Sequence, residues 1–264
     1  MKTITQLTTL ALCTTFLFGC KATDDATSGS GNSSLKMELA NNVVTQKASG
    51  GFSAATAPLT FSDSATTFTI TEARMHVRDI RFDTSSTDLP GTAHTVAGPY
   101  IMDLLAGTAY PNNIEFDLPT GNYQRVDIRL DESNIEDGLL TAEDPLLGKA
   151  LVVSGTHDYN GVADGTFTMT IKISEDIRFE PTNGFAVDTE TGANVTLTYK
   201  VTDWLEDPNT LLKIDLSSCI ASQGLMDNVN HIALTEGTQC EGITESIGNI
   251  VKENMKNKYD MSNQ

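Results

Sequence analysis

The sequence has few basic residues, few aromatic residues and few long hydrophobic runs. Its 264 residues contain 35 Asp and Glu against 17 Lys and Arg, which gives a formal net charge of −18. Such a chain has little with which to neutralise phosphates, so nucleic acid is excluded as a partner. Aromatic residues make up 6% of the chain, with a single tryptophan. No internal repeat is visible, and the composition excludes coiled-coil, collagen-like and polytopic membrane classes.

Local signatures of catalysis are also missing. The chain contains no G-x-S-x-G, H-E-x-x-H, Walker or G-x-G-x-x-G pattern. The histidines have no second donor at helix or strand spacing, so we expect them to be solvated or capped and not to bind metal; they are His76, His94, His157 and His231. We therefore expect no enzyme. A triad assembled in space from distant residues stays open.

The N-terminal residues indicate where the protein is delivered. Residues 1–19 combine Lys2, an apolar stretch from Leu7 to Phe18 and a small residue, which predicts a secretory signal too short to span a bilayer. The end of this stretch, Leu17-Phe18-Gly19-Cys20, resembles the lipobox of bacterial lipoproteins. That resemblance implies cleavage before Cys20 and lipidation of its thiol and new amine. Because Lys21, and not aspartate, follows, it also implies a cell-envelope protein delivered to the outer membrane.

Two further regions follow from composition and cysteine count. Residues 20–34 contain no large apolar side chain after the lipidated cysteine, so we expect a flexible tether. If Cys13 is removed with the signal and Cys20 is lipidated, Cys219 and Cys240 are the two cysteines left in the mature chain. In an oxidising compartment an even pair predicts a disulfide. A redox site would need a CxxC motif, and a metal site would need His231 with further donors, so both alternatives are weaker.

Most of the span 35–208 alternates apolar and polar residues with period two, with turn dipeptides at short intervals. This pattern predicts a mainly β, antiparallel β-sandwich of immunoglobulin-like type. The parity changes twice between Phe68 and Phe82, near Glu72 and near Asp79, which predicts bulges or a break in a long, edge-like strand. Leu151–Val153 is a continuous apolar run typical of a strand covered on both faces.

Further strands and the C-terminus complete the expected body. Alternation predicts strands at 114–118 and 126–130, with a turn between them. Residues 209–264 are expected to form a disulfide-stapled segment whose helix, capped by Thr244, packs on the sandwich. Trp204 is expected in the core, because large aromatic residues are mostly buried. A carbohydrate platform is the alternative.

Acidic loops are the sharpest candidate for a site. Residues 131–144 hold six carboxylates, and 158–165 alternate oxygen-bearing side chains with turn glycines. Calcium prefers six to eight oxygen ligands from flexible loops. The calcium candidates are Asp131, Asp137, Asp158, Asn160 and Asp164. Neither loop matches the EF-hand spacing, and charge runs are usually solvated faces, so an acidic turn without metal is favoured and no cofactor is expected.

The segments 98–105 and 118–123 resemble strand–turn–strand pieces of uncharacterised bacterial lipoprotein β-sandwich domains, a resemblance that implies fold alone. The resulting expectation is a lipid-anchored, non-catalytic binding module for an envelope protein, a glycan or other envelope polymer, or a small ligand at the loop ends. Two alternatives stay open: an envelope hydrolase using carboxylates from the sandwich loops, and a calcium-stabilised adhesin unit.

Overall fold

The computed structural model describes residues 30–40, 59–62, 66–85, 93–158, 165–210, 214 and 231–263. Strands dominate these ranges. They are β1 (Ser30–Ala40), β2 (Leu59–Ser62), β3 (Thr67–Asp83), β4 (Ala93–Asp103), β5 (Thr108–Tyr110), β6 (Ile114–Pro119), β7 (Gly121–Tyr123), β8 (Arg125–Leu130), β9 (Leu151–His157), β10 (Gly165–Ile171), β11 (Glu175–Phe179), β12 (Phe185–Val187), β13 (Asn194–Lys200), β14 (His231–Thr235) and β15 (Tyr259–Asn263). The helical elements are the 3-10 turns η1 (Ile135–Asp137) and η3 (Val201–Asp203) and the helix α2 (Ile247–Asn257).

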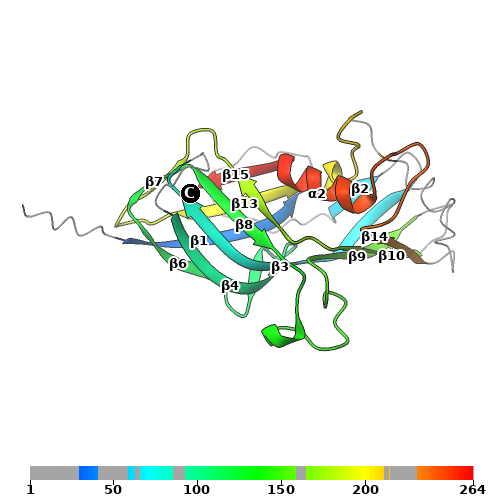
Figure 1. Cartoon of the computed structure of the whole chain (residues 1–264), viewed down its shortest axis with the longest axis horizontal. Coiled ribbons are helices and arrows are strands. Elements are labelled where there is room, and N and C mark those ends of the chain that lie inside the picture. Colours follow the sequence, from blue (N-terminus) through cyan, green and yellow to red (C-terminus); the bar gives the residue numbers. More distant parts are fainter. Residues whose placement is uncertain are drawn as a thin grey trace, which may run out of the picture.

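The strands form two main sheets that share one apolar core (Figure 1). In the larger sheet the hydrogen-bonded path runs β11-β8-β3-β9-β10-β14, and β8 and β9 pair with different parts of the same side of β3. The opposite side of β3 pairs with β2 and β4, and β5 pairs with β4. The smaller has the order β15-β13-β1-β6, and β12-β7 is a separate ribbon. The mainly β prediction is confirmed, and the arrangement is consistent with a sandwich. The expectation of antiparallel pairing is wrong at two places, because β1 pairs with β13 and β10 with β14 in parallel.

Strand β3 contains the two irregularities that the sequence predicts. Its register shifts between Ile70 and Glu72 against β9, and again between Val77 and Asp79 against β4 and β8. At each shift one extra residue, Thr71 or Arg78, changes which positions of the strand face the core, so that the apolar side chains beyond it point inwards again. The expectation of an edge-like strand is wrong. β3 is paired on both sides, with β2 and β4 along one side and β9 and β8 along the other.

Aromatic residues and α2 fill one end of the core. Trp204 is 1% exposed and packs edge-on against Tyr199, which confirms the core expectation. Helix α2 buries Ile250, Val251 and Met255 in the same core and contacts β11 and β14. The side-chain amide of its Asn254 donates to the main-chain oxygens of Trp204, at 3.1 Å, and Glu206, at 2.7 Å. The helix thus packs on the sandwich as expected.

The expected cap of this helix lies two residues too early. Ser246, and not Thr244, is the N-cap, and its hydroxyl accepts a hydrogen bond from the Asn249 N–H at 3.4 Å. Both residue types satisfy the free N–H groups of a first turn, so the composition alone does not separate them.

Two expected boundaries need correction. The last five residues of the predicted tether, Ser30–Ser34, belong to β1 and pair with β6. Their side chains are small and polar, but their backbone is bonded in the sheet, and the buried Ser33 hydroxyl accepts from the Ala193 N–H at 3.0 Å. The segment 209–264 is also no separate appendage, because it supplies β14 to the large sheet and β15 to the small one.

The expected disulfide lies only partly within the described residues. Cys240 is buried and disulfide-bonded. Cys219 lies outside the described residues, so its pairing with Cys240 stays a prediction. The expected lipidation site Cys20 lies outside them as well.

The bulge in β3 predicts a steric requirement on β9. Gly155 faces Ile70 beside the register shift, and a methyl group on it would collide with the main-chain oxygen of Thr69. Gly155→Ala should therefore lower the free energy of unfolding by about 2–3 kcal/mol, as overpacking against backbone does. Urea unfolding of the full chain measures this. Gly121→Ala is the control, because no other atom lies within 4 Å of the place that its methyl group would take, and an equal loss in both variants would contradict the steric explanation.

Candidate functional site

A loop of twenty residues, 131–150, leaves the large sheet between β8 and β9. These two strands follow one another along the same side of β3, β8 against Val77–Asp83 and β9 against Phe68–Met75. The chain therefore leaves the sheet at the end of one strand and re-enters at the start of the next. The loop projects from the body below β3 in Figure 1, where it is drawn in green.

Hydrogen bonds within the loop order its tip. Asn134 and Asp137 form a reciprocal capping box around η1: the Asn134 side chain accepts from the Glu136 N–H at 3.1 Å, and the Asp137 carboxylate accepts from the Asn134 N–H at 2.9 Å. Gly138 ends the turn with φ 71°, a left-handed conformation that glycine adopts without strain. The buried Ser133 hydroxyl donates across the loop to the Leu146 carbonyl at 2.6 Å. The loop is therefore a defined structure of its own.

Arg74 of β3 ties the loop to the sheet. Its guanidinium donates to both carboxylate oxygens of Asp144, at 2.9 and 3.0 Å, and to Glu72 at 2.6 Å. Glu72 in turn accepts from the Ser154 hydroxyl at 3.0 Å. The hydrogen bonds from Arg74 are the main reason that the pKa of Asp144 lies below its usual range. A two-point guanidinium–carboxylate contact fixes orientation as well as distance.

His76, two residues along the same face of β3, is enclosed by the loop. Only 3% of its side chain is exposed. Nδ1 donates to the main-chain oxygen of Asp131 at 2.7 Å, since a carbonyl only accepts, and Nε2 lies 3.4 Å from the Asp137 carboxylate. The imidazole thus connects the start of the loop with η1. Of the two expected states, solvated or capped, His76 and His157 are not solvated, since both are buried, and His76 is capped by the Asp131 carbonyl.

Asp131 joins the loop to a neighbouring turn. One carboxylate oxygen accepts from the Ser174 hydroxyl at 2.7 Å and the Glu132 N–H at 3.0 Å, and the other from Arg78 at 3.1 Å. The Ser174 hydrogen bond is the largest cause that lowers the pKa of Asp131, although burial opposes it. This carboxylate is therefore held ionised by donors of the protein itself.

The underside of the loop is apolar. Leu146 of the loop, Ile101 of β4 and Val152 of β9 form a small buried cluster on the outer face of the sheet, and Leu139 and Leu140 pack against it half-buried. This cluster explains why Leu151–Val153 is buried on both faces, as the sequence predicts. The loop thus covers part of a sheet face that would otherwise be open to water.

Exposed apolar side chains remain beside this cluster and in η1 of the loop that covers it. Tyr110 of β5 is 55% exposed and stands directly opposite Ile101 in the sheet register, so both side chains lie on the same face. Ile135 in η1 is 48% exposed. We call Tyr110, Ile135, Leu139 and Leu140 the apolar strip. Leu105, at 36%, is the third exposed large apolar residue in the described part of the chain.

Acidic side chains accompany the strip. The loop 131–150 contains six carboxylates and one lysine, Lys149. Three of these carboxylates are engaged by bases outside the loop: Asp144 by Arg74, Asp131 by Arg78 and Glu132 by Lys172. The tip is therefore both apolar and negatively charged.

The structure separates the five calcium candidates. Asp131 and Asp137 share the loop, but N–H, hydroxyl and guanidinium donors already face their oxygens. Asp158 lies at the far end of β9, where it accepts from the Thr67 N–H at 2.5 Å. Asn160 and Asp164 lie outside the described residues. In the described part of the chain no three His, Cys, Asp or Glu side chains are grouped to hold a metal ion.

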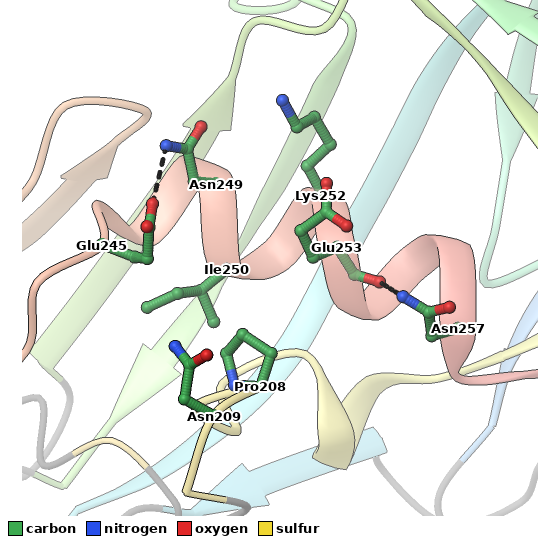
Figure 2. A pocket seen from close by; sticks show the side chains of 8 residues that line it. All are labelled: Pro208, Asn209, Glu245, Asn249, Ile250, Lys252, Glu253 and Asn257. Carbon is green, nitrogen blue, oxygen red and sulfur yellow. Dashed lines mark hydrogen bonds between the residues drawn. The ribbon is translucent and has the colours of Figure 1, made fainter.

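A groove along α2 is a second concave feature. It has a volume of about 450 Å³ and lies between Pro208 and Asn209 on one side and the helix on the other (Figure 2). Two of its amides already have partners on or next to the helix: Asn249 donates to Glu245, just before α2, at 3.1 Å, and Asn257 to the Glu253 carbonyl at 2.8 Å. The lining is polar throughout except for Pro208 and Ile250, and its described residues include no aromatic side chain.

The acidic loop is evident in the sequence, whereas the contribution of Arg74, His76 and Tyr110 to this site is not. The alternation along β3 does place Arg74 and His76 on the polar parity, opposite Met75 and the core. The alternation does not indicate that the loop 131–150 covers these two side chains. The cross-strand position of Tyr110 likewise depends on a register that only the folded sheet defines.

Comparisons with known proteins add no relationship: no family model, curated protein or solved structure matches the chain. Among the residues that the structure describes, no helix is long and apolar enough to cross a membrane.

The pKa of Asp144 predicts how the loop anchor depends on pH. A carboxyl whose pKa is lower in the folded state stabilises the fold fully above its unfolded pKa of about 3.9, and this contribution is lost as pH falls through the folded value. Asp144→Asn should therefore cost about 1 kcal/mol of unfolding free energy near pH 7 and progressively less below about pH 4. Urea unfolding between pH 7 and pH 2.5 measures the difference.

Asp176→Asn is the matched control, because Asp176 is largely exposed and its one ion pair with a described residue is the long contact with Arg129 at 3.6 Å. A cost for Asp144→Asn that stays constant across this pH range would contradict the role of the ion pair.

Proposed function

We propose that the chain is a lipid-anchored cell-envelope protein whose β-sandwich acts as a non-catalytic binding module. The observation that carries the binding function is the apolar strip on the ordered loop. Single exposed apolar residues are common, but here the exposed Tyr110 and two half-buried leucines border one cluster on the sheet, and the exposed Ile135 belongs to the loop that covers that cluster. Since the capping box and Arg74 already order the loop, a partner would not have to supply that ordering free energy.

The proposed anchor rests on the sequence Leu17-Phe18-Gly19-Cys20, which resembles a lipobox. Two or more acyl chains on Cys20 would hold the chain stably at a membrane. The net charge of −18 supports attachment through lipid and not through the protein surface, because anionic headgroups repel such a body. Delivery to the outer membrane and an immunoglobulin-like order of the strands belong to the same proposal.

The hydrolase alternative has one observation in its favour, the proximity of His76 to the Asp137 carboxylate. A histidine with a carboxylate is a common general base. Here, however, both ring nitrogens face oxygens of the loop and the ring is buried beneath it, so a substrate would have to displace the loop to reach Nε2. This geometry suits a structural role, and we favour the binding function.

The anchor predicts the fate of a cysteine variant. Cys20→Ser removes the thiol that would carry the lipid, so the protein should move from the membrane to the soluble fraction of its own cell. Fractionation followed by immunoblotting measures this. Cys13→Ser is the control, because that cysteine lies within the expected signal and the variant should stay with the membrane. Retention of Cys20→Ser in the membrane would refute the anchor.

The binding function predicts a loss on charging the strip. Ile135→Asp places a carboxylate at the exposed position in η1, and recovery of a partner crosslinked to the intact lipoprotein in its own envelope should fall about tenfold or more. Thr189→Asp, an equally exposed change in the turn between β12 and β13, is the control and should leave recovery unchanged.

Both variants should keep the wild-type melting temperature, since each site is exposed. Equal recovery from the wild type and Ile135→Asp would contradict a role for the strip. Recovery of no partner from any of the three proteins would contradict the binding function.

A further inference from the structure

The charges around the apolar strip bear on what can cover it. Among the described residues, Arg74, Arg78 and Lys172 are the Lys and Arg side chains from outside the loop that form ion pairs with it, and the buried His76 faces Asp137. Glu136 and Glu143 are exposed, and neither makes an ion pair within the described residues. An apolar side chain at the tip therefore stands among negative charges that the protein itself leaves uncompensated.

This combination disfavours two occupants. A second copy of the chain would bring the same carboxylates against these, and like charges across an interface cost several kcal/mol. An anionic lipid surface repels them for the same reason. A surface that is apolar at its centre and basic at its rim would complement both the apolar strip and the carboxylates around it.

We propose that the apolar strip docks into an apolar depression rimmed by Lys and Arg on a partner protein. This inference rests on the proposed binding function and specifies its partner. Ile135 and Tyr110 would supply the buried contact, whereas Glu136 and Glu143 would steer association and select the partner. The loop would enter as a preformed element, because the capping box orders its tip and His76 bonds the main chain at its start.

Photo-crosslinking tests the contact directly. A benzophenone amino acid replaces Ile135, Tyr110 or, as the control, Thr189 in the full lipoprotein, which is irradiated in its own envelope. We expect positions 135 and 110 to capture the same protein and position 189 not to capture it. The crosslinked peptide, sequenced by mass spectrometry, should contain Lys or Arg close to the modified residue.

Binding of that purified protein to the full lipoprotein in detergent then tests the charges. We expect Kd to rise about tenfold or more between 0.05 and 0.5 M NaCl. Glu136→Lys with Glu143→Lys should weaken binding by a similar factor, and Ile135→Ala by about tenfold. Glu190→Lys, an exposed charge reversal between β12 and β13, is the matched control and should leave Kd unchanged.

The outcomes separate this inference from the proposed function. Capture from positions 135 and 110 of a protein whose binding is insensitive to salt and to both glutamate reversals would overturn the basic partner and leave the binding module standing. Capture of a second copy or of lipid would overturn it too. Equal capture at position 189 would show that the contact is not specific to the strip and would overturn the inference. No capture from any position would overturn both proposals.

Discussion

The large sheet depends on a single 17-residue strand. β3 pairs with β2 and β9 over its first half and with β4 and β8 over its second. A strand of that length twists and would drift out of alternation with the core, and the bulges at Thr71 and Arg78 absorb this drift. Phe68, Met75 and Phe82, one from each stretch, are all fully buried as a result.

The opposite face of β3 follows from the same geometry. All six arginines of the chain lie in β3, β8 and β11. On this outer face Asp83 faces Arg125 and Arg81 faces Asp127 across neighbouring strands, and direct ion pairs of 2.7–3.1 Å join several of these charges. A carboxylate as buried as Asp83 is tolerable because Arg81 and Arg125 both donate to it. Arginine, scarce in this acidic chain, is thus concentrated where sheet charges must be paired.

Local patterns predict the features that depend on neighbours in sequence. The parity changes near Glu72 and Asp79 locate both bulges, and alternation locates β6 and β8. What such patterns do not predict is which strands meet. The strands at 114–119 and 125–130 have the sequence pattern of a hairpin but belong to different sheets. The first residues of β1 have too little apolar surface to indicate a strand. Pairing of this kind is decided by backbone hydrogen bonds over long sequence separations, which composition does not encode.

The same distinction explains why the sequence locates the acidic loop but offers it as a calcium candidate. Six carboxylates in fourteen residues are visible in the sequence, yet their partners come from β3 and from the turn before β11. Once Arg74, Arg78 and Ser174 are in place, Asp131 and Asp144 serve to hold the loop, and Asp137 closes the capping box at its tip. A calcium ion would have to displace these donors. The donors of the protein itself therefore order the loop, and in the proposed binding function an ordered loop would present the exposed Ile135 at a smaller cost in conformational entropy.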